Sequence, residues 1–317
     1  MSVRGRMSML GAVAVLAAAC SSGGGGATTA PTAAASAPAA SAPAASVPAS
    51  APAGQAAEAS PIPGGLLDHV LKAGKLVVST DPNYAPQSQQ KPDGTFEGFD
   101  IDVATEVAKR LGVGVDFVTP DWAVITAGGW GGRWDASVGS MTVTSDREKV
   151  LDFSPPYYYT PAQMTASQAS GITTLDGLAG KTVCVGEATT YLDWLQGKKL
   201  DFGSLSPTST PPAGVQATTQ KTDAQCPQLW ASGRNDFEGW LSSSTAVDGA
   251  IKAGLPVVKV GDPVYAEPLA IAIDKAGPDP FDFNAKLKTI IDAMHQDGTL
   301  KGFSEKWFGI DLTQPPE

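Results

Sequence analysis

Residues that commonly catalyse reactions or bind metals are scarce in this chain of 317 residues. Only two histidines are present, His69 and His295, and each lies in a separate predicted amphipathic helix. Neither has the spacing to another ligand or base that a zinc site or a catalytic triad requires. We interpret His69 as an exposed helical residue and His295 as part of a last helical turn, where a positive charge suits the helix dipole.

The glycine-rich segment Gly128–Gly132 does not indicate a nucleotide site. It lacks a following Lys-Ser or Lys-Thr pair and a helix start that would bind pyrophosphate, so we interpret it as a turn. Carboxylates are numerous, but no spacing singles out an acid–base pair. The sequence therefore predicts no cofactor and no metal, and it favours a binding protein over an enzyme.

The charge balance argues against two classes of partner. The chain has 22 basic and 32 acidic residues, which give a net charge of −10. Nucleic acids and anionic membrane surfaces both attract basic patches, so neither is an expected partner of this acidic chain.

The first 20 residues have the pattern of a secretory signal. Arg4 and Arg6 precede a short apolar stretch that is too brief to span a bilayer, and Ala18 and Ala19 stand directly before Cys20. This end resembles a bacterial lipobox, which implies that Cys20 becomes the lipidated (palmitoylated) first residue. The alternative is an ordinary signal peptide with Cys20 incidental.

Residues 21–64 form a predicted disordered linker. They consist almost entirely of Ala, Pro, Ser, Gly and Thr, and such a composition cannot bury enough apolar surface to offset the entropy of ordering. A long tether directly after a lipidation site suits a protein anchored on the outer face of a membrane.

The other two cysteines, Cys184 and Cys226, form the only pair left once Cys20 is assigned to lipid. In an exported protein a Cys184–Cys226 disulfide is therefore expected, and two free buried thiols are the alternative.

The remaining residues, about 250, are enough for one large domain or two lobes. A buried strand is predicted at Lys75–Thr80, a helix capped by Asp100 at its start, and another strand at Val113–Val118. A strand, a helix and a strand at this spacing predict a parallel α/β sheet. Further strands are predicted at 134–138, 181–185, 236–241 and 256–260, and further helices at 66–71, 224–232, 245–253 and 284–294, the last capped by Asn284.

The segment Gly139–Tyr158 carries the most specific pattern in the chain. A Gly-Ser-Met-Thr-Val-Thr turn is followed by Arg147, then Asp-Phe-Ser and a Pro-Tyr pair. The pattern resembles the signature of family-three extracellular solute-binding proteins, which deliver polar amino acids to ABC importers. Three shorter segments agree in the family's order: Gly98–Val103, Asp297–Leu300 and Lys306–Gly309. The resemblance covers roughly residues 66–312.

The resemblance implies a two-lobed periplasmic-binding-protein type II fold, in which each lobe is a mainly parallel sheet flanked by helices. Two strands, near Tyr157–Thr160 and Pro263–Glu267, would join the lobes as a hinge. Lobe 1 would then comprise residues 65–160 plus 266–317, and lobe 2 residues 161–265. Closure of the hinge around a ligand would be the signal that the importer reads.

The resemblance also assigns ligand-binding residues in lobe 1. Arg147 matches the family's carboxylate-binding arginine, and a guanidinium can hold a carboxylate through two parallel hydrogen bonds. The preceding turn, Ser140, Met141 and Thr142, would contact the same ligand. Asp81 matches a position for a polar contact or an ammonium partner, and Tyr84 and Trp122 match aromatic walls. The alternatives are a solvated surface arginine and ordinary core or turn aromatics.

In lobe 2, Glu187–Tyr191 resembles the family's turn at a helix start, where Thr189 and Thr190 would offer backbone N–H groups to the carboxylate. One departure is important. The family usually has an ammonium-binding Asp after its sixth strand, and here that position is Ser242 or Ser243, of which we assign Ser243. A hydroxyl cannot neutralise an ammonium, so either Asp81 or Glu238 supplies the charge, or the ligand has no free α-ammonium.

The implied function is that of a monomeric, lipid-anchored, extracytoplasmic subunit that captures an amino acid or related polar solute and delivers it to ABC permease subunits. The alternative is a dehydratase of the prephenate or arogenate type on the same scaffold, with Glu187 or Glu238 as its general acid.

Overall fold

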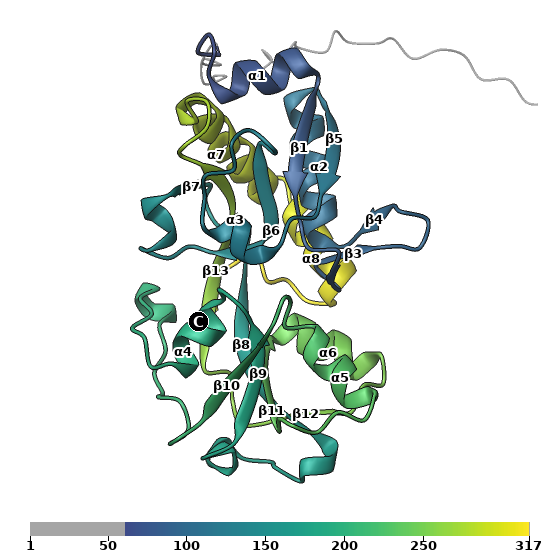
Figure 1. The fold of residues 1–317 in the computed structure, drawn as a ribbon. Coiled ribbons are helices and arrows are strands. Elements are labelled where there is room, and N and C mark those ends of the chain that lie inside the picture. The colour runs from purple at the N-terminus through teal and green to yellow at the C-terminus, as the bar shows by residue number, and fades with distance from the viewer. Residues whose placement is uncertain (1–60, 317) are drawn as a thin grey trace, which may run out of the picture. The chain divides into compact units, whose positions relative to one another are not determined.

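The computed structural model describes residues 61–316, which form an α/β structure around one large sheet (Figure 1). Its strands are β1 (Lys75–Ser79), β5 (Gly114–Val118), β6 (Ala136–Thr142), β7 (Leu151–Phe153), β8 (Tyr158–Ser167), β9 (Thr182–Gly186), β10 (Gln216–Gln220), β11 (Gly239–Ser243), β12 (Val257–Lys259) and β13 (Tyr265–Asp274). The order across the sheet is β10-β9-β11-β8-β13-β6-β1-β5, with β12 beside β8 and β7 beside β13. A separate small sheet contains β2 (Asn83–Tyr84), β3 (Ser88–Gln90) and β4 (Phe96–Glu97).

The large sheet is parallel at its two ends and antiparallel in its middle. At one end β1 pairs in parallel with β5 and β6, and at the other β9 pairs in parallel with β10 and β11. Between them β8 and β13 run antiparallel, with Tyr158 opposite Leu269 and Ala162 opposite Tyr265. The predicted parallel α/β arrangement is confirmed, and the two strands predicted as a hinge are neighbours.

Of the four hydrophobic cores among the described residues, two contain residues of both β8 and β13. The helices are α1 (Leu66–Ala73), α2 (Phe99–Leu111), α3 (Trp122–Thr126), α4 (Thr190–Leu195), α5 (Gln225–Ala231), α6 (Ser244–Lys252), α7 (Phe281–Gln296) and α8 (Thr299–Phe308). The first core joins α1, α2, α7 and α8 to β1 and β6, and the second joins α4 to β8, β9 and β11. Tyr158 and Leu269 belong to the first core, whereas Ala162 and Tyr265 belong to the second.

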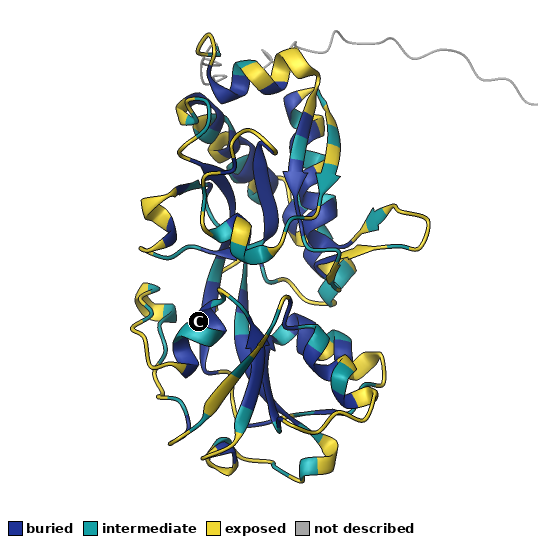
Figure 2. Ribbon diagram, viewed as in Figure 1, coloured by how far each residue is buried: buried dark blue, intermediate teal, exposed yellow. Residues whose placement is uncertain are grey.

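Burial follows this arrangement. In Figure 2 the central strands β6, β8 and β13 are largely dark blue, whereas β10 at the sheet edge is mostly yellow. A strand that is buried along most of its length carries a nearly continuous apolar sequence. An exposed edge strand carries no such signal, which is why the polar segment Gln216–Gln220 was not predicted as a strand.

Helix α2 begins two residues earlier than predicted. Its N-cap is Gly98, whose φ of 136° suits glycine, and a Cβ there would lie 2.2 Å from the carbonyl oxygen of Gln87. Asp100 is therefore not the cap. It is the second residue of the helix, fully buried, and its carboxyl accepts hydrogen bonds from Ser140 and Tyr157.

Other predicted boundaries also move by a few residues. Helix α7 begins at Phe281 rather than at Asn284, and its cap residue is Pro280. Strand β6 continues to Thr142, beyond the predicted end at residue 138, because its last residues are buried as fully as its first. Such shifts are small for element ends, which depend on tertiary contacts.

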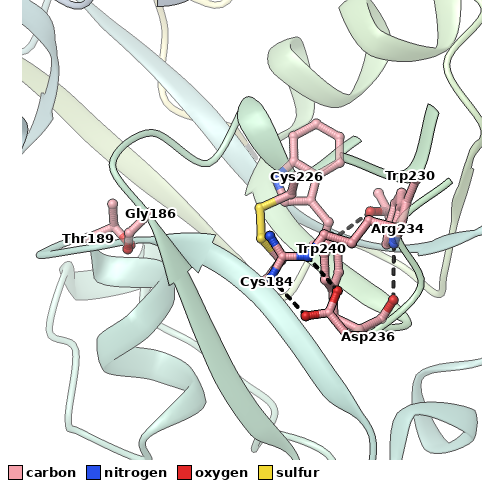
Figure 3. Close-up of a disulfide and its surroundings, with 10 residues drawn as sticks. Cys184, Gly186, Thr189, Cys226, Trp230, Arg234, Asp236 and Trp240 are labelled. Atoms are coloured by element: carbon pink, nitrogen blue, oxygen red, sulfur yellow. Dashed lines mark hydrogen bonds and ion pairs between the residues drawn. A yellow bond between two sulfur atoms is a disulfide. The ribbon is translucent and has the colours of Figure 1, made fainter. Parts of the chain in front are cut away.

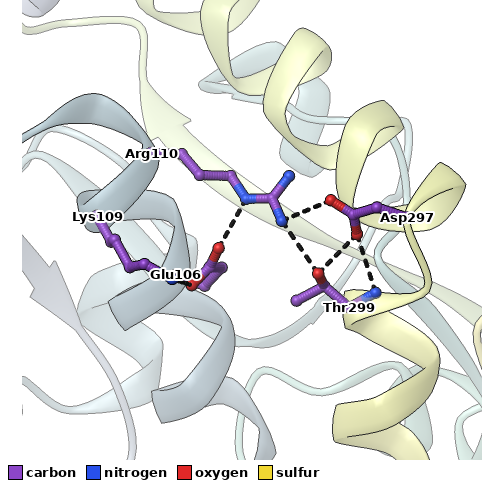
Figure 4. Close-up of polar contacts among 5 residues, drawn as sticks. All are labelled: Glu106, Lys109, Arg110, Asp297 and Thr299. Atoms are coloured by element: carbon purple, nitrogen blue, oxygen red, sulfur yellow. Dashed lines mark hydrogen bonds and ion pairs between the residues drawn. The ribbon is translucent and has the colours of Figure 1, made fainter. Parts of the chain in front are cut away.

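Arg110 ties α2 to the junction of α7 and α8 (Figure 4). Its Nε donates to Glu106 at 2.9 Å, and one terminal nitrogen donates to Asp297 at 2.8 Å and to Thr299 at 3.0 Å. Asp297 also accepts the hydroxyl and backbone N–H of Thr299, and these bonds with the nearby guanidinium lower the Asp297 pKa to about 2. The Asp-Gly-Thr segment thus fixes the start of α8 against α2.

The predicted disulfide between Cys184 and Cys226 is present and joins β9 to α5 (Figure 3). Both cysteines are fully buried beside Trp230 and Trp240. Gly186 and Thr189, also labelled in Figure 3, follow Cys184 on the same segment.

Residues 1–20 with Cys20, and most of the predicted linker 21–64, lie outside the described residues. Among residues 61–316, no helix combines the length and the apolar character needed to cross a bilayer.

Candidate functional site

A pocket with about 470 Å3 of empty space, open solvent included, is formed by segments from both ends of the large sheet. One side is formed by residues after β1, on α3, and around the end of β6, and the other by residues after β9 and β10. Its lining consists of Asp81, Tyr84, Trp122, Gly139, Ser140, Thr142, Arg147, Gly186, Thr189, Thr190, Tyr191, Lys221, Thr222 and Asp223.

Most of the predicted site residues come together in this pocket, and two do not. Asp81, Tyr84, Trp122, Ser140, Thr142, Arg147, Thr189 and Thr190 line it. Met141 does not, because successive side chains of β6 point to opposite faces, and the Met141 side chain packs with Ile125, Trp130 and Leu151. Ser243 does not line the pocket either, but its hydroxyl accepts a hydrogen bond from the hydroxyl of Tyr84, which does.

Arg147 is the central cation of the pocket. It begins a short 3-10 turn and is 9% exposed, so burial lowers its pKa, while the nearby carboxylate of Glu267 acts in the opposite direction. Its guanidinium donates to the carbonyl oxygens of Thr142 at 2.8 Å and Ala188 at 2.9 Å. No carboxylate among the described residues lies within ion-pair distance of it. These two carbonyl contacts orient a cation that has spare N–H groups for an anion.

Trp122 covers this guanidinium. The Arg147 carbon lies 5.5 Å from the ring centroid, and the indole N–H donates to the carbonyl oxygen of Ala188 at 3.3 Å. Ala188 has a φ of 56°, as does Ser140 at the opposite wall. Positive φ at non-glycine residues is uncommon and often marks functional turns. Both turns therefore present backbone groups in a strained conformation beside the arginine.

Glu267 lies behind the pocket and was not predicted as a site residue. It is 1% exposed, and one of its oxygens accepts the hydroxyls of Thr142, at 2.9 Å, and Thr190. Burial raises the pKa of this carboxyl, and the two hydroxyls and Arg147 oppose the rise. An acidic residue in the interior of strand β13, which is otherwise apolar up to its last residue, Asp274, was a signal that could have drawn attention to it.

Ser140 rests on a buried polar network. Its hydroxyl donates to Asp100 at 2.8 Å and lies 2.6 Å from the hydroxyl of Tyr158, and its N–H donates to the Tyr157 hydroxyl at 3.0 Å. The Tyr157 hydroxyl in turn donates to Asp100 at 2.7 Å. Burial raises the pKa of Asp100 to about 7, although both hydroxyl donors lower it. The network fixes the Ser140 turn to α2 and to the start of β8.

On the second side, Thr189 caps α4, and Gly186 permits its close approach. The Thr189 hydroxyl donates to the Gly186 carbonyl at 2.7 Å and accepts the Leu192 N–H at 3.2 Å. A Cβ on Gly186 would lie 2.9 Å from the Thr189 methyl carbon and 3.3 Å from the backbone nitrogen of Asp223. A larger residue at position 186 would therefore crowd the segments that carry Thr189 and Asp223 on this side of the pocket.

Two carboxylates, Asp81 and Asp223, line the pocket from opposite sides. Asp81 is half-buried and accepts the Asn83 N–H at 2.7 Å, and burial raises its pKa. Asp223 is 3% exposed, and burial, reinforced by the charges of Asp81 and Glu267, raises its pKa well above the usual range. Sequence reasoning missed Asp223 because the strand that precedes it, β10, has no apolar pattern.

The carboxylate alternatives Glu238 and Glu187 do not line the pocket. Glu238 accepts the Thr182 N–H at 3.2 Å and lies 3.8 Å from Lys181. Ser243 caps α6 and accepts the hydroxyl of Tyr84 at 2.9 Å and the side-chain amide of Gln87 at 3.0 Å. Glu238 is therefore not placed to supply the charge that Ser243 lacks.

Lys221, also missed by sequence reasoning, lies at the mouth of the pocket. Its ammonium donates to both oxygens of Asp121, at 2.8 and 3.0 Å, and both side chains are exposed. Asp121 precedes α3 and Lys221 follows β10, so this ion pair connects the two sides of the pocket.

Comparisons with known proteins show the family of the chain. Residues 76–310 match the family model described as bacterial extracellular solute-binding proteins, family 3. The L-cystine-binding protein TcyJ of Escherichia coli strain K12 is 31% identical over 255 residues, which cover 79% of this chain and 88% of the relative.

Solved structures show the same fold. A Streptococcus pneumoniae ABC uptake transporter substrate-binding protein with bound histidine gives a TM-score of 0.67 at 20% identity and covers 80% of this chain and 100% of its own. An ancestral amino acid-binding protein, a precursor of cyclohexadienyl dehydratase, gives a TM-score of 0.62 at 29% identity and covers 76% and 99%. The predicted type II fold is confirmed, and the chain belongs to the bacterial extracellular solute-binding proteins of family 3.

Proposed function

We propose that this chain is the substrate-binding subunit of an ABC importer and that it binds an amino acid in the pocket around Arg147. The observation that carries the proposal is a buried guanidinium, with no carboxylate of residues 61–316 within ion-pair distance, in a pocket lined by residues from both ends of the large sheet. A ligand carboxylate can pair with this guanidinium through charge-assisted hydrogen bonds. The named relatives and solved structures that bind cystine and histidine support the same ligand class.

The proposed lobes are residues 65–160 plus 266–317 and residues 161–265. Membership of the two cores supports this division, because the first core takes residues from both ends of the described chain and the second takes residues between them. We further propose that the protein acts as a monomer and delivers its ligand to permease subunits. Its hinge would be the pair of strands β8 and β13.

Lipid anchoring through Cys20 on the extracytoplasmic face is also a proposal, supported by the signal pattern of residues 1–20. Incorporation of a clickable palmitate analogue by the wild-type protein, and not by Cys20→Ala, is the expected result. Equal labelling of the two proteins would refute the anchor without affecting the ligand proposal.

The dehydratase alternative is less supported. Neither Glu187 nor Glu238, its candidate general acids, lines the pocket. The ancestral neighbour that precedes a dehydratase is itself named an amino acid-binding protein. Turnover of prephenate or arogenate by the purified chain would nevertheless establish this activity directly.

The amino acid proposal is tested by replacing Arg147. A thermal-shift screen over amino acids, amines and organic acids first identifies the best ligand, which at 100 times its Kd stabilises the protein by about 2.7 kcal/mol. Arg147→Ala should abolish this rise in Tm, because the ligand carboxylate loses its buried partner. Arg147→Lys should restore part of it, because an ammonium keeps the charge but not the bidentate geometry.

The matched control is Arg234→Ala, since Arg234 is an exposed arginine that pairs with Asp236 outside the pocket (Figure 3). It should keep the full ligand-induced rise in Tm. An Arg147→Ala protein that folds and still shows the wild-type rise would remove Arg147 from the site.

A further inference from the structure

Opposite charges are present in the pocket but do not neutralise each other. The charged residues of the lining are Asp81, Arg147, Lys221 and Asp223. Lys221 is paired with Asp121, which does not line the pocket, and among residues 61–316 the guanidinium of Arg147 donates hydrogen bonds to carbonyl oxygens and to no carboxylate. Asp81 and Asp223 make no ion pair among the described residues. The pocket therefore presents a cation at one place and two carboxylates at another.

Asp223 is the less satisfied of the two carboxylates. It is 3% exposed, and its Oδ1 has no hydrogen-bond partner among residues 61–316. The hydroxyl of Ser242 is near enough to favour the charged form but makes no hydrogen bond within normal geometry, and its own oxygen is unpartnered too. A buried carboxylate oxygen left without a partner is costly.

Asp81 and Asp223 both line the pocket, and the charge of Asp81 disfavours the charged form of Asp223. The charge of Asp81 is one of the causes that raise the pKa of Asp223. Asp81 follows β1, whereas Asp223 follows β10 and precedes α5, so one carboxylate comes from each side of the pocket. A cation placed between them would remove their repulsion and satisfy the free oxygen.

We propose that Asp223, with Asp81 opposite it, forms the ammonium subsite of the pocket and makes the protein selective for zwitterionic α-amino acids over the corresponding carboxylic acids. This inference rests on the proposed function, because Arg147 must hold the carboxylate end of the same ligand. It assigns the negative charge that pairs with the ligand ammonium mainly to Asp223. The sequence alone had indicated Ser243, Glu238 and Asp81 for this position. Because its two carboxylates come from opposite sides, the subsite also favours the closed pocket when an ammonium is bound.

The test compares amino acids with analogues in which hydrogen replaces the α-ammonium. Isothermal titration of the purified full-length chain uses L-arginine, L-histidine and L-cystine, each beside its analogue: 5-guanidinopentanoate, imidazolepropionate and 3,3′-dithiodipropionate. The wild-type protein should bind its best amino acid at least about 30-fold more tightly than the matching analogue, as expected for loss of a buried charge partner.

The variants assign this selectivity to a residue. Asp223→Asn keeps the size of the side chain and should weaken binding of the amino acid by about 30-fold or more, while binding of the analogue changes little. Asp81→Asn should act in the same direction with a smaller loss, because Asp81 is half-buried. Glu238→Gln is the control, since Glu238 lies outside the pocket, and it should leave both affinities unchanged.

The outcomes separate this inference from the proposed function. If the wild-type protein binds no amino acid, the proposed function fails and the inference fails with it. If the wild-type protein binds an amino acid and Asp223→Asn binds it within about threefold, or the wild-type protein binds the analogue equally well, only the ammonium subsite is refuted. Asp223→Ser removes the same charge with a smaller side chain and decides the matter if the Asn variant does not reach the wild-type Tm.

Discussion

Arg147 and Asp100 are two buried ionisable groups near the pocket that differ in whether they keep their charge at neutral pH. Arg147 lines the pocket and Asp100 lies behind Ser140 in its wall, and burial shifts the pKa values of both toward the neutral form. Arg147 remains charged because the ordinary guanidinium pKa is far above any working pH. Asp100, with a pKa of about 7, changes charge in the physiological range. The first is suited to binding an anion, and the second to responding to pH.

Asp100 should make the stability of the protein depend on pH. Its pKa of about 7 in the folded state exceeds the value of about 3.9 expected in the unfolded state. The folded protein therefore binds the extra proton, and the unfolding free energy falls as pH rises from about 4 to about 7. Asp100→Asn removes this loss, while the amide can still accept from Tyr157 and donate to Ser140.

Denaturant titrations of both proteins at pH 5 and pH 8 measure this effect. Relative to the variant, the wild-type protein should lose up to about 3 kcal/mol of unfolding free energy between these two pH values. Asp297→Asn is a suitable control. The Asp297 pKa of about 2 is lowered, so its contribution is present above about pH 4 and is lost only as pH falls further. A constant difference between wild type and Asp100→Asn would contradict a titrating Asp100.

Site residues that belong to a local sequence motif could be predicted, whereas those brought to the pocket only by the tertiary fold could not. Arg147 and the turn at Ser140 belong to one continuous pattern, so sequence alone could place them together. The side chain of Met141 does not line the pocket, and the alternation of a strand already puts it on the opposite face from Ser140. Asp223 and Lys221 follow an exposed polar strand, and no local pattern indicates that such a strand ends at a pocket.

The elements were predicted better than their ends. Strands β1, β5 and β9 and helices α1, α5 and α6 lie within a few residues of their predicted positions, because their apolar spacing reflects one buried face. Gly98 displaced Asp100 as the cap of α2 because the close carbonyl of Gln87 comes from another segment. A contact between segments that are far apart in the sequence cannot be predicted from the spacing of apolar residues within one segment.

The disulfide joins the two elements that carry the second wall of the pocket. Cys184 lies two residues before Gly186 in β9, and Cys226 lies three residues after Asp223 in α5. The bond closes a loop with a sequence separation of 42 residues, for which chain entropy predicts a contribution of about 4 kcal/mol to stability. It should therefore stabilise the protein and also fix the spacing of Gly186 and Asp223.

Replacing both cysteines by serine should lower the Tm and weaken ligand binding together. Calorimetric unfolding measures the first effect, and isothermal titration below the variant's Tm measures the second. Wild-type protein treated with a thiol-free reductant gives the same comparison without new side chains. If affinity stayed at the wild-type value while stability fell, the bond would support the fold without positioning the pocket.

The two sides of the pocket are connected by polar contacts in addition to strands β8 and β13. Trp122 and Arg147 both donate to Ala188, Tyr84 donates to Ser243, and Lys221 pairs with Asp121. When a ligand contacts both sides, part of its binding free energy shifts the equilibrium from the open form to the closed form. Contacts that form only on closure therefore change affinity without changing the stability of each core.

The Lys221–Asp121 pair tests this idea, because both side chains are exposed and their removal disturbs no core. An exposed pair contributes about 0–1 kcal/mol, so Asp121→Asn and Lys221→Gln should each raise the ligand Kd by at most about fivefold. The double variant should cost no more than either single one, and the difference should shrink in high salt. The Tm without ligand should not change. A loss above about 30-fold in Lys221→Gln alone, with Asp121→Asn unaffected, would instead mean that the lysine binds the ligand and that the pair does not control closure.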